Sequence, residues 1–550
     1  MDQSVADQTS FDFIVVGGGN AGAVVASRLA SSASHPTVLL LEAGGTNEGF
    51  EGMSGVKRYQ AAFSETSKAN WKYKTVPQFG REIDYSRGKG LGGSTAINFC
   101  GWLVGPRDDW DEFAEIVGDG AFEWKNAREC LKRVECLHDT VPEDFREYIS
   151  PRAEDHGLNG AVDIAYEKVW HPSVRTVFEA GRQAGYRINP DVNSGDPIGF
   201  GIGATCVYNS SRVTAASGYL RSVPANLTII TDAHVAKVTF EGTTANGVLL
   251  TNGTHYLARK EVIISGGAIN SPQILLLSGI GPSSQLEELG IDPVKDLPHV
   301  GANLQDHCFS TAGIVVRSEG ENEDPISRQT PSPMGWLKME EVFDSKEFRD
   351  LPSSTQSFLR KPTVPMWELV THSPFLDGHR SSLHENVMAG MALIMLPQSR
   401  GTVTLQTANP LDKPLIDPKF LSHPFDQRVA IESMRKLLQF LEAPILQDKT
   451  IRKVGWPESS SDEGLLAHFQ SNLHSSWHMS GTVCMGQSEN TSCVDSDFRV
   501  HGIDRLRVVD MSVVPFVPNT HTQTTAYILG EIASDKLITE YRLNEGKAPA

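Results

Sequence analysis

Residues 17–22 (GGGNAG) have the spacing of a loop that binds the diphosphate of a dinucleotide. In the G-x-G-x-x-G pattern, Gly17 makes the tight turn, Gly19 lets the backbone approach the pyrophosphate, and Gly22 lets a helix pack closely. Glu42 follows 20 positions after Gly22, where a carboxylate accepts the hydroxyls of an adenosine ribose. An acid there, rather than an arginine, favours an unphosphorylated ribose and therefore FAD or NAD over NADP.

Two histidines towards the other end of the chain are candidates for proton transfer. His478 follows Trp477 in a turn-like segment, and His521 lies in the polar turn 519–523. A lone histidine is more often structural, but imidazole is the side chain whose charge changes near neutral pH. Both histidines stand beside segments that we expect to hold a cofactor, which favours a catalytic role for the pair.

Apolar patterning predicts the elements that position these residues. Residues 11–16 predict a strand before the glycine turn, the stretch AVVASRLA after it predicts a helix, and 37–41 predict a second strand that ends at Glu42. Without these elements the glycine run would indicate only an ordinary turn. Residues 506–510 predict a buried strand, and a helix from about Thr524 to Leu537 would direct its positive end towards His521.

Residues 87–95 (RGKGLGGST) form a second glycine-rich segment. They cannot be a helix or a central strand, and their many free amides suit an anion or a flat ring. A flexible surface loop is the alternative, but Ile97, Phe99 and Trp102 follow with apolar side chains and indicate a buried position.

The middle of the chain predicts both strands and helices. Strands are expected at 227–230 and 236–241, which alternate like a meander, and at 261–265 and 401–406. A helix after residue 265 would be capped by Ser271, with Pro272 in its first turn and Gly279 after its end. A further helix is expected at 427–442.

Residues 316–376 differ from the rest of the chain in composition and in hydrophobic pattern. They are rich in charged residues, proline and serine and show no sustained period. A long irregular stretch inside a compact enzyme favours a lid or substrate-facing loop, with an uninformative insertion as the alternative.

Composition and charge limit the class of protein. At 550 residues the chain exceeds the size of one hydrophobic core, so at least two domains are expected. With 49 basic and 67 acidic residues the net charge is −18, which argues against nucleic acid or an anionic membrane as partner. We see no secretory pattern and no run long enough to span a bilayer, and the seven cysteines are scattered, so a cytoplasmic protein with reduced thiols is expected.

Seven ordered segments between residues 11 and 541 resemble the glucose–methanol–choline (GMC) oxidoreductases. They are FIVVGGGNAGAVVASRLA, RGKGLGGSTAIN, GGAINSPQILLLSGIGP, LPHVGANLQDH, SRGTVTLQTANPLDKPLIDP, WHMSGTVCMG and LRVVDMSVVPFVPNTHTQTT. The resemblance implies an α/β fold with a Rossmann-like FAD-binding domain, built from discontinuous segments, and an antiparallel-sheet substrate domain. The expected FAD-binding segments are 1–155, 205–312 and 478–550, and the expected substrate-binding segments are 156–204 and 313–477. The family also divides its chains by sequence, and in those terms this chain has an N-terminal GMC region of about 11–310 and a C-terminal GMC region of about 397–537.

The resemblance also assigns site residues. The pyrophosphate turn is Gly17, Gly19, Asn20, Ala21 and Gly22, and the ribose acceptor is Glu42, with Ala43 next to it. Gly93, Ser94 and Asn98 lie along the flavin and phosphates, the backbone of Val235 meets the adenine, and Asp510 and Met511 make a second phosphate contact. His478 and His521 match the paired active-site residues, with Thr522 also at the cofactor. No metal is implied.

Some positions depart from the family pattern. Ile97 stands where some members carry the histidine that binds FAD covalently, so non-covalent FAD is implied. Met511 stands where alanine is commoner, and Met479 and Gln523 replace prolines that are frequent after the two active-site residues. Because Met479 and Gln523 lie beside the chemistry, the family pattern does not name the substrate.

The implied activity is oxidation of an alcohol of a small metabolite to the carbonyl, by hydride transfer to flavin N5, with oxygen or another acceptor reoxidising the flavin. An alcohol is too weak an acid to ionise at neutral pH, so His478 is assigned as the base and His521 as a hydrogen-bond partner of the developing alkoxide. A chain without a secretory signal favours biosynthetic metabolism over secreted sugar or lignin chemistry. The alternative is a flavoprotein of the same fold with net non-redox chemistry, a lyase or cyclase.

Overall fold

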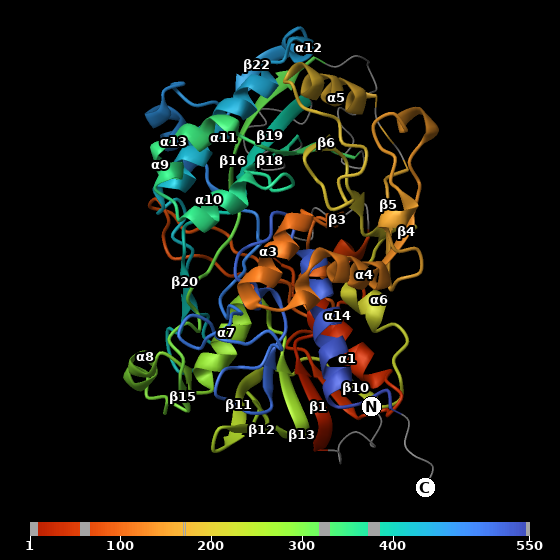
Figure 1. Cartoon of the computed structure of the whole chain (residues 1–550), viewed down its shortest axis with the longest axis vertical. Coiled ribbons are helices and arrows are strands. Elements are labelled where there is room, and N and C mark those ends of the chain that lie inside the picture. Colours follow the sequence, from red (N-terminus) through yellow and green to blue (C-terminus); the bar gives the residue numbers. More distant parts are fainter. Residues whose placement is uncertain are drawn as a thin grey trace.

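The computed structural model describes residues 9–54, 66–168, 170, 172–317, 331–371 and 386–545. Two large sheets, one towards each end of the long axis, form the frame of the molecule, and helices pack against both (Figure 1). Among the described residues, no helix combines the length and apolar character needed to cross a lipid bilayer.

The first sheet has seven strands in the order β10-β2-β1-β13-β12-β11, with β24 paired to β13. Their bounds are β1 Ser10–Val16, β2 Val38–Leu41, β10 Leu227–Ile230, β11 Val235–Glu241, β12 Thr244–Leu250, β13 His255–Ile264 and β24 Leu506–Val508. Val16 pairs with both Leu41 and Ile264 in parallel register, so these strands end at one edge of the sheet. Ligands of open parallel sheets bind at this carboxyl edge.

Two helices that begin near this edge pack side by side, α1 (Asn20–Ala30) and α14 (Gln523–Glu540) (Figure 1). Their backbones approach closely because a glycine lies at the crossing. A Cβ on Gly530 would lie 2.9 Å from the Cβ of Val24 and 3.0 Å from the carbonyl oxygen of Ala21. The packing ties the helix that follows the glycine turn to the helix that follows His521.

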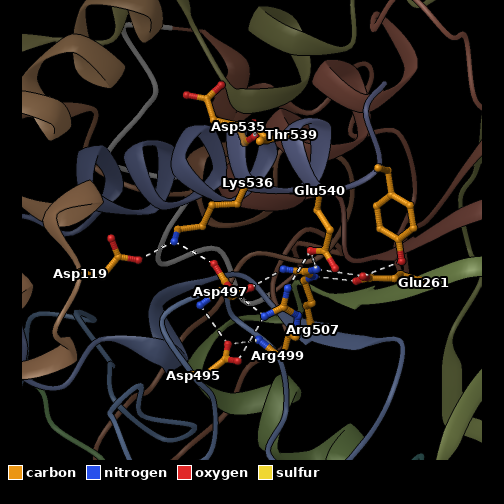
Figure 2. Close-up of polar contacts among 11 residues, drawn as sticks. Asp119, Glu261, Asp495, Asp497, Arg499, Arg507, Asp535, Lys536, Thr539 and Glu540 are labelled. Carbon is orange, nitrogen blue, oxygen red and sulfur yellow. Dashed lines mark hydrogen bonds and ion pairs between the residues drawn. The ribbon is translucent and has the colours of Figure 1, made fainter. Parts of the chain in front are cut away.

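The C-terminal end of α14 is held by a network of charged side chains (Figure 2). Arg507 of β24, only 1% exposed, donates from Nε and Nη2 to the two carboxylate oxygens of Glu261 at 2.7 and 3.0 Å. Arg507 also contacts Glu540, and Lys536 donates to Asp497 at 2.9 Å. The network joins the end of α14 to β13, β24 and the 495–499 loop.

The second sheet is antiparallel, with the order β17-β18-β19-β16-β22 and β23 paired to β16. Its strands are β16 Cys308–Val316, β17 Met334–Leu337, β18 Trp367–Val370, β19 Asn386–Ile394, β22 Thr450–Val454 and β23 His474–Ser475. Helix α11 (Pro424–Leu441) packs against β19 and β16, and α13 (Asp462–Ser471) packs against α11.

Smaller elements surround the two sheets. A four-stranded sheet has the order β3 (Gly101–Trp102), β7 (Ala204–Thr205), β5 (Val162–Ala165), β4 (Glu135–His138). Two-stranded pairs are β8 (Val207–Tyr208) with β9 (Ser211–Arg212), β14 (Ile280–Gly281) with β15 (Lys295–Asp296), and β20 (Thr402–Thr404) with β21 (Leu415–Asp417); β6 is Gly199–Gly201. The other α-helices of the described ranges are α3 Arg107–Val117, α4 Trp124–Val134, α5 Ser173–Gln183, α6 Ala215–Tyr219, α7 Gly267–Leu277, α8 Ser283–Glu288, α9 Lys346–Arg349, α10 Ser353–Arg360 and α12 Pro444–Gln447.

Strand β10 corrects one expectation from the sequence. Residues 227–230 do not belong to a meander with 236–241, because β10 pairs in parallel with β2 at the edge of the first sheet. The meander consists of β11, β12 and β13. An edge strand exposes part of its surface and therefore alternates like a meander strand; Leu227 is the buried residue of β10.

Helix α7 corrects a second expectation, since it begins four residues before Ser271 and that residue is not its cap. The Ser271 hydroxyl instead donates to Asp510 at 2.5 Å. Pro272 lies inside the helix, where its missing N–H leaves the carbonyl of Ala268 without its usual partner. The hydroxyl of Thr482 donates to that carbonyl at 2.7 Å, which explains how the helix accommodates the proline.

The stretch 316–376 contains more regular structure than its sequence predicts. Strands β17 and β18 and helices α9 and α10 lie within it, so the interpretation as a long irregular lid is wrong for 334–370. These strands are short and are stabilised by pairing with each other and with β19, which local sequence does not reveal. Residues 318–330 and 372–376, where the rest of that prediction falls, lie outside the described residues.

Candidate active site and cofactor cavity

A cavity of about 380 Å³ lies where the two large sheets face each other. Val16, Leu41 and Ser265 line it at the carboxyl ends of strands of the first sheet. Phe309 and Leu393 line it from the second sheet. The cavity is therefore at the edge where an α/β sheet binds its ligand, and it is closed from the other side by antiparallel strands.

The predicted site residues come together in this cavity. Those that line it are Gly17, Gly19, Asn20, Ala21, Glu42, Ala43, Gly93, Ser94, Asn98, Val235, His478, Asp510, Met511, His521 and Thr522. Gly22 is the exception, because it packs inside α1, where a Cβ would lie 2.0 Å from the carbonyl oxygen of Gly17. Its lack of a side chain permits the tight join between turn and helix.

The glycine turn has the shape that a diphosphate requires. Gly17 has a φ of +107°, and a Cβ there would lie 2.3 Å from the carbonyl oxygen of Ser265. A Cβ on Gly19 would meet nothing nearer than the Cα of Gly93, at 3.9 Å, so the backbone of Gly19 is bare towards the cavity. The turn and the second glycine loop together form a backbone cradle in which dinucleotide phosphates fit.

Glu42, the predicted ribose acceptor, makes hydrogen bonds within the chain. Its Oε2 accepts the N–H of Gly18 at 2.8 Å, and its Oε1 accepts the N–H groups of Gly44 and Gly90, both at 2.9 Å. The carboxylate therefore ties the glycine turn to the loop 87–95. Since each carboxylate oxygen has two lone pairs, both sites of Oε1 are used and one acceptor site remains on Oε2, which a ribose hydroxyl could use.

Gln523, which replaces a frequent proline, connects several cavity segments. Asn98 donates to its side-chain oxygen at 3.1 Å, and its amide nitrogen contacts the carbonyl of Gly101. Asn20, the first residue of α1, donates to its backbone carbonyl at 3.2 Å. A proline has no side-chain amide, so Gln523 holds the loop after residue 98 to the start of α14 in a way that the family's commoner residue cannot.

His478 is held on one side of its ring. Its Nδ1 lies 3.0 Å from the Ser476 hydroxyl and 2.9 Å from Nδ1 of His307. The Ser476 hydroxyl donates its proton to the carbonyl oxygen of His307 at 2.8 Å, so towards His478 it can only accept. In this hydrogen-bond arrangement Nδ1 of His478 carries the proton, and its Nε2 keeps a lone pair.

Burial disfavours the charged forms of His478 and His307. Burial, with smaller contributions from His521 and His307, holds the pKa of His478 well below its ordinary 6.5. The same cause lowers the pKa of His307 to about 3, and Nε2 of His307 has no hydrogen-bond partner among the described residues. Asp306 accepts the backbone N–H of His478 at 2.8 Å, and burial raises the pKa of Asp306 to about 6.

His521 lies next to His478, with ring centroids 4.9 Å apart. Its Nε2 is 2.9 Å from Oε1 of Glu368, a fully buried carboxylate on β18 whose Oε2 has no hydrogen-bond partner in the described ranges. A Cβ at position 101 would lie 3.5 Å from Nδ1 of His521, so Gly101 leaves room at the other side of the ring. The contact between His521 and Glu368 joins the loop before α14 to the second sheet.

Sequence reasoning missed three residues that contact the histidine pair: Ser476, His307 and Glu368. His307 ends the motif LPHVGANLQDH, and Ser476 lies two positions before His478, so both stand in segments that had already attracted notice. Glu368 carries no such signal, because it lies 153 residues from His521 within the stretch interpreted as a lid.

Family models for GMC oxidoreductases match residues 11–309 and 397–530. The chain belongs to the GMC oxidoreductase family and is an FAD-dependent oxidoreductase, as the motifs predicted.

Among curated relatives, the chain is 31% identical to a glucose methanol choline oxidoreductase of Aspergillus terreus, over 98% of this chain and 94% of that protein. It is also 31% identical to an alcohol dehydrogenase [acceptor] of Pseudomonas putida, over 96% of each. Among solved structures, formate oxidase superposes with a TM-score of 0.85 at 25% identity, over 98% of this chain and 99% of that one.

Proposed function

We propose that this protein oxidises the hydroxyl group of a small-molecule alcohol to a carbonyl, with His478 as the general base. The observation that carries the proposal is the position of His478 in the cavity beside His521, with a lowered pKa and with no hydrogen-bond partner at Nε2 among the described residues. Relatives named as alcohol dehydrogenase and choline dehydrogenase support an alcohol substrate. When bound, FAD supplies the acceptor for the hydride.

In the proposed reaction, the protein removes the hydroxyl proton of the alcohol as the hydride leaves the carbon. Nε2 of His478 accepts that proton, and the charge that results on the ring is shared through Nδ1 with Ser476 and His307. A positioned base of this kind typically contributes about 10²- to 10⁴-fold to the rate.

His521 is proposed to hold the developing alkoxide. Glu368 accepts the Nε2 proton of His521, which leaves Nδ1 directed towards the side of Gly101. The proposed donor to the alkoxide is Nδ1 of His521, and the carboxylate of Glu368 fixes the orientation of the ring through Nε2.

The cofactor is proposed to bind without a covalent bond. Gly17, Gly19, Asn20 and Ala21 would hold the pyrophosphate with Asp510 and Met511, Glu42 and Ala43 the ribose, and Val235 the adenine; Gly93, Ser94, Asn98 and Thr522 would lie along the flavin. Ile97 has no nucleophilic atom for a flavin linkage. Acid precipitation should leave the flavin in the supernatant, and yellow colour that stays with the pellet would refute this proposal.

Anaerobic stopped-flow reduction of the flavin by a panel of alcohols tests the proposed reaction. We expect at least one primary or secondary alcohol to bleach the flavin, and peroxide detection on admission of air then separates an oxidase from a dehydrogenase. The His521→Asn variant should be slowed less than His521→Ala, because asparagine keeps a side-chain donor. If no alcohol reduces the flavin while the protein converts a substrate without net oxidation, the chain is a lyase or cyclase of this fold.

We also propose a cytoplasmic location. All seven cysteines are free thiols, six of them buried, which fits a reducing compartment. Fractionation of the native host with an antibody to this chain tests the location.

A further inference from the structure

One face of the sheet β3-β7-β5-β4 gathers three side chains that the proposed reaction does not use. Cys136 and His138 are two positions apart on β4, so they point to the same face. Asp163 of β5 pairs directly with Cys136 in the parallel register. Leu137 and Ile164, the residues of opposite parity, are buried on the other face.

The polar atoms of the three side chains converge. Nε2 of His138 lies 2.8 Å from Oδ1 of Asp163 and 3.7 Å from Sγ of Cys136, and the three atoms all lie within 4.8 Å of one another. The His138 ring is held by stacking on Tyr208, with centroids 3.9 Å apart and planes at 11°. The side chains of His138 and Asp163 are 29% and 36% exposed, so an ion from solvent can reach them.

We propose that Cys136, His138 and Asp163 form a site for one divalent transition-metal ion, best suited to Zn²⁺ and not to Mg²⁺ or Ca²⁺. A thiolate, an imidazole and a carboxylate are the ligand types that zinc prefers, whereas magnesium and calcium require oxygen ligands. The three ligands come from two adjacent strands, so a bound ion would also cross-link β4 and β5.

The geometry needs only a small adjustment to hold the ion. Zinc bonds of about 2.0–2.3 Å in a tetrahedron place ligand atoms roughly 3.3–3.8 Å apart. The distance from Sγ to Nε2 is already in that range. The distance from Oδ1 of Asp163 to Nε2 must lengthen from 2.8 Å to roughly 3.3 Å, and rotation of the partly exposed Asp163 side chain provides this movement. The fourth position is open to water or to the carbonyl oxygen of Leu158, which lies 3.2 Å from Sγ.

Binding involves no oxidation or reduction. The metal–sulfur bond forms as the Cys136 thiol loses its proton to solvent. The metal–nitrogen bond forms at Nε2 of His138 as the hydrogen bond to Asp163 breaks and the ring carries its proton on Nδ1 instead, by exchange with solvent. Affinity should therefore fall as pH decreases. In the absence of a metal, the bonds from Cys136 to Leu158 and from His138 to Asp163 satisfy the three side chains, and the test below separates this purely structural role from metal binding.

The experiment uses the purified flavin-loaded protein after chelation and dialysis. Zn²⁺ is titrated by calorimetry, and Co²⁺ is titrated separately, because its d–d bands fall to the red of the flavin absorption and report tetrahedral sulfur ligation. Maleimide labelling gives a third readout, since Cys136 is the half-exposed thiol and the other six are buried. The variants are Cys136→Ser and His138→Gln, and the matched control is His255→Gln, which changes an exposed histidine on β13.

We expect one Zn²⁺ per chain, protection of Cys136 from maleimide, and no competition from excess Mg²⁺. Each site variant should lose more than about 100-fold in affinity, since loss of even an outer-shell partner typically costs 10- to 100-fold. The control should bind as the parent does. Equal Zn²⁺ affinity in parent and Cys136→Ser, or no binding by a parent that retains its flavin and melting temperature, would overturn the proposal.

Discussion

The two ends of helix α14 place charged and polar groups in opposite conditions. At the C-terminal end, Arg507 is buried but both carboxylate oxygens of Glu261 pair with it, and the surrounding lysine and acids are also paired (Figure 2). At the N-terminal end, the polar atoms next to His478 and His521 include a free carboxylate oxygen on Glu368 and a free nitrogen on His307. Buried polar atoms normally have partners, so these two atoms leave hydrogen-bonding capacity unused beside the histidines.

This difference indicates which mutations should affect stability and which should affect chemistry. A closed network loses free energy of folding when one member is removed. A cluster with unused hydrogen-bonding capacity contributes less to folding and more to binding and proton transfer. Mutations at the C-terminal end of α14 should therefore change stability, and mutations at its N-terminal end should change the reaction.

The largest effect is expected for His478→Ala. Loss of the base should slow flavin reduction by about 10²- to 10⁴-fold while flavin content and melting temperature stay close to those of the parent. Anaerobic stopped-flow absorbance measures the reduction step alone. His468→Gln, which changes a half-buried histidine outside the cavity, is the control and should reduce normally. Reduction of His478→Ala at the parental rate would contradict the assignment.

The opposite end of the helix should respond in stability. Arg507→Met leaves Glu261 buried without its cation, and breaking a buried pair in this way typically costs about 3–5 kcal/mol. We expect a lower melting temperature and faster thermal inactivation, with the flavin-reduction rate of the folded fraction unchanged. Arg221→Met, which changes an exposed arginine after α6, should melt as the parent does. A large loss of reduction rate without loss of stability would show that the two ends are coupled.

Glu368→Gln should affect chemistry more moderately. Glutamine keeps an oxygen that accepts from His521 but removes the negative charge. A charge-assisted hydrogen bond contributes about 1.5–3 kcal/mol, so we expect flavin reduction to slow by about 10- to 100-fold. Stability should change little or rise, since a buried charge is removed. A parental rate would assign Glu368 a packing role only.

Ser476→Ala should have a smaller effect on the same reaction. It removes the acceptor that keeps the proton on Nδ1 of His478, although His307 still offers a second acceptor. A neutral hydrogen bond contributes about 0.5–1.5 kcal/mol, which corresponds to a loss of about 2- to 10-fold in rate. Ser476→Thr keeps the hydroxyl and should restore the parental rate. Equal loss in both variants would indicate a steric effect instead.

The smallest change is expected on acidification. A base is active when unprotonated, and because burial holds the pKa of His478 well below 6.5, the reduction rate should not fall as pH decreases through 6.5. The acidic limb should lie well below that value. If an inflection occurs near pH 6, Asp306→Asn should remove it, since the pKa of Asp306 is about 6. An acidic limb at 6.5 that persists in Asp306→Asn would show that His478 is solvated.

The sequence predicts best what local spacing determines. The glycine turn and the acid after β2 depend on neighbouring residues, and each lies where its pattern places it. The start of α7 could not be predicted, because the group that accepts the first amide of that helix is Asp510, far along the chain. The role of Glu368 could not be predicted either, because its contact with His521 depends on the pairing of β18 with β19 and not on neighbouring residues in the sequence.

The order of strands in the first sheet has a consequence for biosynthesis. Strand β24 is the last strand of the described ranges, and it pairs with the carboxyl half of β13, which is translated about half a chain earlier. Until residue 508 leaves the ribosome, this part of β13 presents an unpaired edge to other nascent chains. A message truncated before that point should therefore give an aggregating product without flavin, even though its complete nucleotide turn was the first motif synthesised.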